Sequence, residues 1–158
     1  MNVNKPFFLV VICSLSALFI SLSLFSSFLN SFASNHEIQI QYSETKEQVI
    51  AFYDRFGIDE EIINSLDEFL VIKGENFGFE KFSNLIFILI EGLGVYLMYN
   101  LKKKGFIIYT FVQLLFLGEI WFLYPMQNPI AFGQFLMTFG ISGLFVFLYA
   151  LNLKSMES

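Results

Sequence analysis

Two apolar runs joined by a lysine-rich turn decide the fold of this chain: FSNLIFILIEGLGVYLMYN (residues 82–100), LKKKG (101–105) and FIIYTFVQLLFLGEIWFLY (106–124). Each apolar run holds 19 residues and one charged residue. About 20 mainly apolar residues are enough for a helix to cross the hydrocarbon core of a bilayer. Helices joined by so short a turn are antiparallel neighbours. The stretch therefore predicts a transmembrane helical hairpin.

Two further apolar segments flank this hairpin. Residues 6–33 and residues 130–153 contain no charged residue. The link over residues 125–129 is again short, so the last three spans should form an up-down-up unit within residues 82–154. We therefore predict an all-α fold, an integral membrane four-helix bundle, with a short cytoplasmic tail in residues 155–158.

The composition agrees with a membrane protein. The chain has 158 residues, of which 56% are hydrophobic and 15% are charged, and its net charge is −5. Soluble domains carry about 25% charged residues and 45–50% apolar ones. Twenty-two Phe stand against a single Trp. These values exclude a soluble enzyme, a disordered regulator, a disulfide-stapled secreted domain and a basic nucleic-acid binder.

The first span has two interpretations. Ser31 and Ala33 fit the small-residue cleavage site of a secretory signal peptide, and Lys5 supplies a weak positive flank. However, the apolar region of a signal peptide is about 7–15 residues long, and this one is nearly twice that. We therefore predict an uncleaved signal anchor in residues 1–33.

The lysines predict the orientation in the membrane. Lys5, the triplet Lys102, Lys103 and Lys104, and Lys154 fall on one side of a four-span chain. Positively charged flanks stay in the cytoplasm. We therefore predict a bacterial inner (plasma) membrane protein with both termini cytoplasmic. Aromatic residues at membrane boundaries should mark the span ends: Tyr96, Tyr99, Tyr109, Trp121, Tyr124 and Tyr149.

Residues 34–81 form an acidic segment outside the membrane in this scheme. They hold eleven of the fourteen acidic residues and only four of the basic ones, a net charge of −7. Two amphipathic helices are predicted. The first has its apolar stripe over residues 49–56, and the second begins at Asp59 and ends at Gly74. The alternating residues 37–42 predict an extended connector.

The apolar stripes of these short helices need a surface to cover them. The candidates are each other, the membrane, the end of the bundle or a partner protein. The acidic residues fit a solvated face, a calcium site or a docking face for a basic partner, and no EF-hand spacing is present.

Two carboxylates within the spans are the most informative residues. A charged group at membrane depth costs about 2.5–3.5 kcal/mol on insertion scales and usually faces the bundle interior. Counting residues from the two turns places Glu91 level with Gln113, and Glu119 level with Gln134. These four residues are the predicted intramembrane polar site, arranged as two pairs.

The polar pairs have a structural and a functional reading. Polar pairs between helices stabilise membrane bundles by about 0.6 kcal/mol on average. The alternative is a small oligomeric proton or cation carrier or channel that uses Glu91 and Glu119. The other spans hold no cation, His or Asp to continue a path, which favours the structural reading.

No catalytic chemistry is visible in the sequence. It contains no CxxC, HExxH, GxSxG or P-loop motif, and its only His and only Cys form no metal site. We therefore expect no enzyme activity, no metal, no cofactor and no nucleic-acid partner. The predicted function is an accessory, assembly or structural subunit of a membrane complex, with lipid, a protein bound through residues 34–81, or a second copy of the chain as partners.

The residues around the lysine turn carry a resemblance. Met98 to Phe106, followed by Tyr109 and Gln113, resembles the corresponding stretch of small four-transmembrane inner-membrane proteins common in Bacteroidetes. The similarity covers spans two to four, about half of the chain. It implies an inner-membrane location and a four-span layout, and it implies no activity.

Overall fold

The computed structural model describes residues 5–32, 40, 43–51 and 60–156, and every regular element among them is helical. Residues 43–51 form a short helical segment, and the other elements are α1 (Phe7–Phe32), α3 (Glu60–Tyr99), α4 (Lys103–Leu123), α5 (Pro129–Ala150) and the 3-10 helix η1 (Leu153–Ser155). The helices α1, α3, α4 and α5 are each long and apolar enough to cross a membrane. The all-helical fold is thus confirmed, and four helices have the length and apolar composition that the four predicted spans require.

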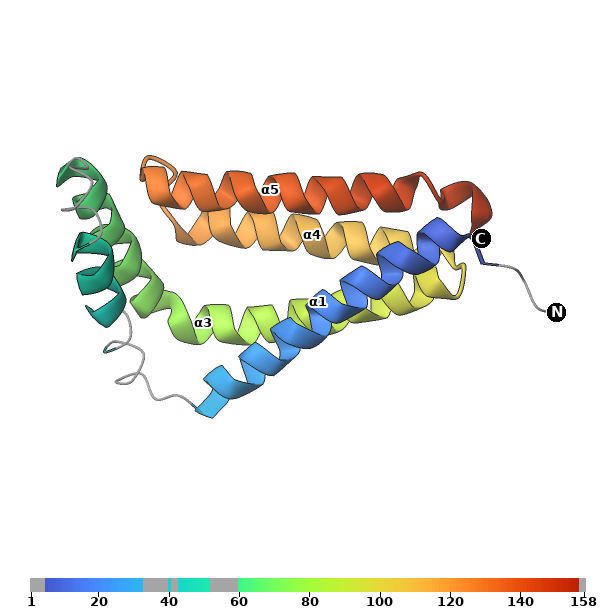
Figure 1. Ribbon diagram of the computed structural model, residues 1–158, viewed down its shortest axis with the longest axis horizontal. Helices are drawn as coiled ribbons and strands as arrows, with labels where there is room; N and C mark the ends of the chain where they lie inside the picture. Colours follow the sequence, from blue (N-terminus) through green and yellow to red (C-terminus); the bar gives the residue numbers. More distant parts are fainter. Residues whose placement is uncertain (1–4, 33–39, 41–42, 52–59, 157–158) are drawn as a thin grey trace.

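The long helices lie side by side, and the α3–α4 and α4–α5 turns connect antiparallel neighbours, as predicted (Figure 1). The α3–α4 turn closes with hydrogen bonds from Leu101 N to the Met98 carbonyl (2.9 Å) and from Lys102 N to the Leu97 carbonyl (2.9 Å). This pattern, with Leu101 at φ 60°, is a Schellman end, where glycine is the usual residue. Leu101 is buried, so its side chain packs in the core despite the unfavourable backbone conformation.

The second amphipathic helix does not end at Gly74, and this prediction is wrong. Instead, α3 runs without interruption for 40 residues, from Glu60 to Tyr99. A glycine ends a helix when it takes the left-handed conformation, but within a helix it only lowers stability by about 1 kcal/mol. The stretch from Gly74 to Lys81 contains no proline to stop the helix. Figure 1 shows that the first part of α3 bends away from the part that lies along α4.

The first part of α3, residues 60–78, is called the α3 arm below. The arm extends past the α4–α5 turn (Figure 1) and packs on it. Phe69 is buried there and stacks on Tyr124 with ring centroids 4.9 Å apart. Ala131 is fully buried in the same cluster. Of the candidate surfaces for the second apolar stripe, the structure therefore selects the end of the bundle.

One face of α3 is exposed along the whole helix and changes from acidic and polar on the arm to apolar beyond it. On the arm it is acidic and polar, with Glu61, Asn64, Glu68 and Glu75. From Phe79 to Tyr96 the exposed side chains are large and apolar: Phe79, Phe82, Leu85, Ile86, Leu89, Leu93 and Tyr96. That apolar part spans about 26 Å at 1.5 Å per residue, close to the hydrocarbon thickness of a bilayer.

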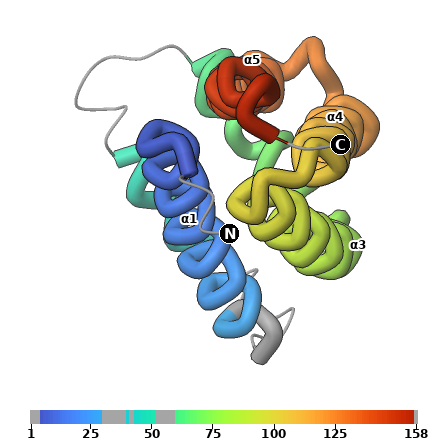
Figure 2. The backbone as a smooth tube through the Cα atoms, turned by 90° about the vertical axis from the view of Figure 1, so that its right-hand side faces the viewer, coloured from blue at the N-terminus to red at the C-terminus, as the bar shows by residue number. Residues whose placement is uncertain are grey.

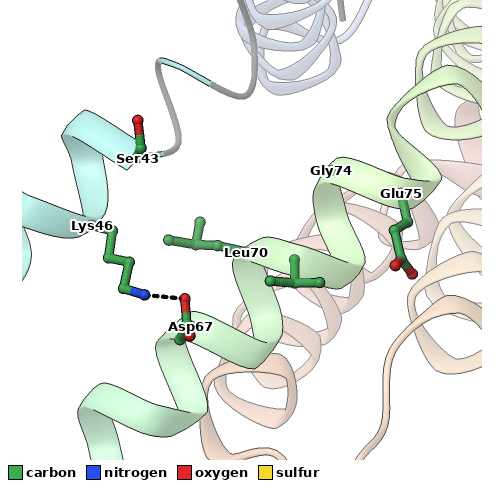
Figure 3. Close-up of a pocket in the computed structure, with 7 residues that line it drawn as sticks. Ser43, Lys46, Asp67, Leu70, Gly74 and Glu75 are labelled. Carbon is green, nitrogen blue, oxygen red and sulfur yellow. Dashed lines mark hydrogen bonds and ion pairs between the residues drawn. The ribbon is translucent and has the colours of Figure 1, made fainter. Parts of the chain in front are cut away.

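The helical segment 43–51 lies against the α3 arm. Lys46 forms an ion pair with Asp67, as Figure 3 shows. Of the first predicted amphipathic helix, residues 52–56 lie outside the described residues. Of the predicted connector 37–42, only Ile40 is described. Their predictions therefore remain predictions.

Candidate functional site

Glycine sets the distance between α3 and α4 near the lysine turn. A Cβ atom on Gly105 would lie 2.5 Å from the carbonyl oxygen of Gly94 and 2.6 Å from the backbone nitrogen of Met98. A Cβ atom on Gly94 would lie 3.0 Å from the backbone nitrogen of Tyr109. Small residues permit this close approach of helices in lipid. The contact fixes which face of α4 points at α3.

That face of α4 carries the residues of the candidate site. Gly105, Tyr109, Val112, Phe116 and Glu119 recur at the spacing of one helical face. Tyr109 and Val112 are buried, and Phe116 meets Phe87 of α3 edge-to-face at 5.1 Å. Glu119 therefore points at α3, while Gln113, one position past Val112, lies at the edge between α3 and α5.

The predicted pair of Glu91 and Gln113 is formed. The Gln113 side-chain N–H donates to Glu91 Oε1 at 2.9 Å. The Ser142 hydroxyl of α5 donates in turn to Gln113 Oε1 at 2.6 Å. Glu91, Gln113 and Ser142 are only 7%, 8% and 6% exposed. One amide thus joins three helices in the bundle interior, and we call these three residues the central network.

The predicted pair of Glu119 and Gln134 is not formed, and this prediction is wrong. The carboxylate of Glu119 accepts a hydrogen bond from the Ser83 hydroxyl of α3. Gln134 lies on α5, and its side chain is half-buried. Counting from a turn gives the depth of a residue but not the direction in which its side chain points. Because Glu119 lies on the face of α4 that packs on α3, its side chain points toward α3.

Further polar contacts join α3 to the α4–α5 turn. The Tyr124 hydroxyl donates to the Glu80 carboxylate. Asn128 caps α5 by accepting from the backbone nitrogens of Ile130 (3.0 Å) and Ala131 (3.3 Å). Its amide also donates to the carbonyl of Ser65 at 2.7 Å. Sequence reasoning missed these contacts, although Asn128 before Pro129 is a recognisable helix start.

An aromatic contact separates the polar groups at the two depths. Ser83 and Glu91 are eight residues apart on α3, about 12 Å along the helix. Phe87 lies between them in sequence, as Phe116 lies between Gln113 and Glu119. The contact between the two Phe rings therefore lies between the Ser83–Glu119 pair and the central network. Among the described side chains, no hydrogen bond connects the two levels.

A separate polar contact joins α1 to α5. The Tyr149 hydroxyl donates to Ser16 Oγ at 2.8 Å, and the Tyr149 ring packs edge-to-face on Tyr109 at 4.9 Å. Tyr109, Tyr124 and Tyr149 are thus buried between the helices, although Tyr124 and Tyr149 lie at the ends of α4 and α5, where boundary residues were predicted. Tyr96, Tyr99 and Trp121 are exposed. A hydroxyl can hydrogen-bond inside a bundle as well as at its surface, so tyrosine alone does not distinguish the two positions.

One cleft lies away from the central network. It measures about 430 Å³ and lies between the helical segment 43–51 and the α3 arm (Figure 3). Its walls carry the Lys46–Asp67 ion pair next to Leu70 and Val71. Within the described ranges, no group of three His, Cys, Asp or Glu side chains could hold a metal ion.

Comparisons with known proteins add no function. No protein-family model, no curated protein and no solved structure matches the chain. The resemblance to four-span Bacteroidetes proteins therefore stays a prediction.

Proposed function

We propose that this protein is a non-enzymatic accessory or assembly subunit of a membrane complex, and that the α3 arm is its docking surface. The observation that carries the proposal is the acidic exposed face of the arm, with Glu61, Glu68 and Glu75 each seven residues apart. Residues seven apart lie on the same side of a helix. Val71, 55% exposed, adds an apolar side chain to that face.

The arm is held firmly enough to present this face. An adjacent side of the arm is anchored through Phe69, which is buried against the α4–α5 turn, and through the hydrogen bond from Asn128 to Ser65. The exposed carboxylates of Glu61 and Glu75 therefore project from a fixed helix, while that of Glu68 accepts a hydrogen bond from the Asn128 amide. Charge complementarity favours a partner with a basic face, since opposite potentials steer association and fix register.

The orientation and location belong to the same proposal. The lysine-bearing turn, the start of α1 and the 3-10 helix η1 lie together at one end of the bundle (Figures 1 and 2), and the acidic arm lies at the other. Positive flanks remain in the cytoplasm. We place the protein in a bacterial inner membrane with the arm on the extracytoplasmic side.

A charge reversal with a matched control tests the docking surface. The test variant is Glu61→Lys with Glu75→Lys, and the control is Glu44→Lys with Glu47→Lys, which changes the net charge equally on the helical segment 43–51. Glu68 is left unchanged because Asn128 donates to it at 3.0 Å.

Each variant is expressed at native level and purified with a tag in mild detergent. We expect the wild type and the control to retain one stoichiometric partner, and the test variant to lose it. A wild-type protein that purifies monodisperse and alone, or equal retention by both variants, would contradict the proposal. A partner that proves to be a second copy of the chain would identify a homo-oligomer.

A carrier or channel is the second candidate, because the carboxylate of Glu91 is buried in the bundle interior. The Phe87–Phe116 contact between the two polar levels counts against a continuous path. Proton and cation flux in liposomes decides the matter, with Glu91→Gln and Glu119→Gln as variants. A wild-type flux that both variants abolish would establish the carrier, and no flux in the wild type would exclude it.

A further inference from the structure

The end of the bundle opposite the α3 arm gathers lysines from three separate parts of the chain. Figure 1 shows the N-terminal end of α1, the α3–α4 turn and the 3-10 helix η1 at one end of the molecule, and Figure 2 shows that end from the front. They bring Lys5, the triplet 102–104 and Lys154. We call this set the lysine end. The ammonium of Lys5 lies 3.4 Å from the ring centroid of Tyr99, which ties the start of α1 to the end of α3.

Positive charge exceeds negative charge at the lysine end. Residues 5–32 and 92–118 contain no Asp or Glu, and Glu157 is the one acidic residue in the sequence from 120 to 158. Lys103, Lys104 and Lys154 are exposed. The five lysines of this end therefore outnumber the acidic residues near them in the sequence. The lysine end is therefore a concentrated positive surface that attracts an anion.

Exposed apolar side chains adjoin these lysines. Phe8 follows Lys5 by three residues and is 46% exposed, and Ile107 follows Lys104 by three residues and is 65% exposed. Leu151, three residues before Lys154, is 59% exposed. Each lysine region thus combines an ammonium group with an apolar surface. A phospholipid offers the matching combination, an anionic phosphate attached to acyl chains, whereas a free anion offers only the charge.

We propose that the lysine end binds the headgroup of an anionic phospholipid, with the acyl chains lying along the exposed apolar side chains of α1, α4 and α5. Clusters of basic residues next to membrane helices attract anionic lipids in this way. The lysine end and the α3 arm lie at opposite ends, so this proposal stands independently of the docking function.

The test measures lipid binding to the purified full chain in nonionic detergent. A micelle has no sides, so the orientation that a variant takes in cells does not affect the result. The probes are phosphatidylglycerol and phosphatidylcholine with identical acyl chains, with affinities measured by native mass spectrometry. The test variant is Lys103→Gln with Lys104→Gln, and the matched control is Lys73→Gln with Lys81→Gln.

We expect the wild type and the control to bind phosphatidylglycerol more tightly than phosphatidylcholine. A lysine near an anionic surface strengthens binding about fivefold, so losing two should weaken phosphatidylglycerol binding by about 5- to 25-fold. Phosphatidylcholine binding should not change. Equal affinity of the wild type for the two lipids, or equal losses in test and control variants, would overturn the proposal.

Two further measurements keep the proposal falsifiable if the variant fails to fold. On the wild type, raising the ionic strength from 0.1 to 1 M shortens the screening length from about 10 to about 3 Å and should weaken only phosphatidylglycerol binding. Inorganic phosphate should not displace the lipid. Displacement at millimolar concentration would identify a site for free phosphate and overturn the assignment to a lipid.

Discussion

Replacing Gly105 by alanine should force α3 and α4 apart. The new Cβ atom would lie 2.5 Å from the Gly94 carbonyl oxygen and 2.6 Å from the Met98 nitrogen, against an ordinary non-bonded separation of about 3.5 Å. Both obstacles are backbone atoms of α3, and they cannot rotate away as a side chain would. The two helices must therefore separate by about 1 Å at this point.

The free energy of unfolding should fall as a result. Overpacking costs about 1–3 kcal/mol. The gain in helix propensity from Gly to Ala is at most about 1 kcal/mol, and it is smaller in the first turn, where Gly105 lies. We expect a net loss of about 1–2 kcal/mol. Gly118→Ala on the same helix is the matched control, because a Cβ atom there meets nothing within 4 Å. It should be neutral or stabilise by up to about 1 kcal/mol.

The assay is unfolding by sodium dodecyl sulfate in mixed micelles, followed by the fluorescence of Trp121, the only tryptophan of the chain. Its ring packs against Phe135 of α5 at 5.5 Å, so separation of the helices changes its surroundings. The two alanine variants should differ by about 1–3 kcal/mol. Equal free energies of unfolding for both variants would refute the argument that a backbone contact sets the α3–α4 distance.

Three further outcomes are expected. Gln113→Leu should lower the free energy of unfolding by about 1–3 kcal/mol, because it removes two hydrogen bonds and leaves the buried Glu91 carboxylate without its donor. Ser142→Ala removes only one hydrogen bond and should lower the free energy of unfolding by about 0.6 kcal/mol. Asn128→Ala should cost about 1–2 kcal/mol in the same unfolding assay through loss of the α5 cap. In intact cells, with the native cysteine replaced by serine, a cysteine at position 60 (Glu60→Cys) should react with an impermeant thiol reagent, and one at position 103 (Lys103→Cys) should not.

Each of these outcomes has a result that contradicts it. Equal losses for Gln113→Leu and Ser142→Ala would mean that the amide does not join three helices. An unchanged free energy of unfolding for Asn128→Ala would mean that the Asn128 side chain does not stabilise the start of α5. Labelling at position 103 together with protection at position 60 would invert the proposed orientation.

The sequence by itself determined the spans and part of the site. Apolar runs of about 20 residues fix the helices, because lipid offers no partner for exposed backbone groups. The lysine turn also fixes the register of α3 against α4, since five residues leave no freedom to slide one helix along the other. Counting from that turn was therefore enough to pair Glu91 with Gln113.

The tertiary structure alone decided which way the side chains face and where α3 ends. Depth along a helix follows from residue number, but rotation about the helix axis follows from packing. The contact of Gly94 with Gly105 turns Glu119 toward Ser83 of α3 and away from Gln134 of α5. The continuity of α3 through Gly74 was likewise not readable from local signals, because a glycine both permits a helix end and tolerates a helix interior, and the packing of the arm on the α4–α5 turn decides between them.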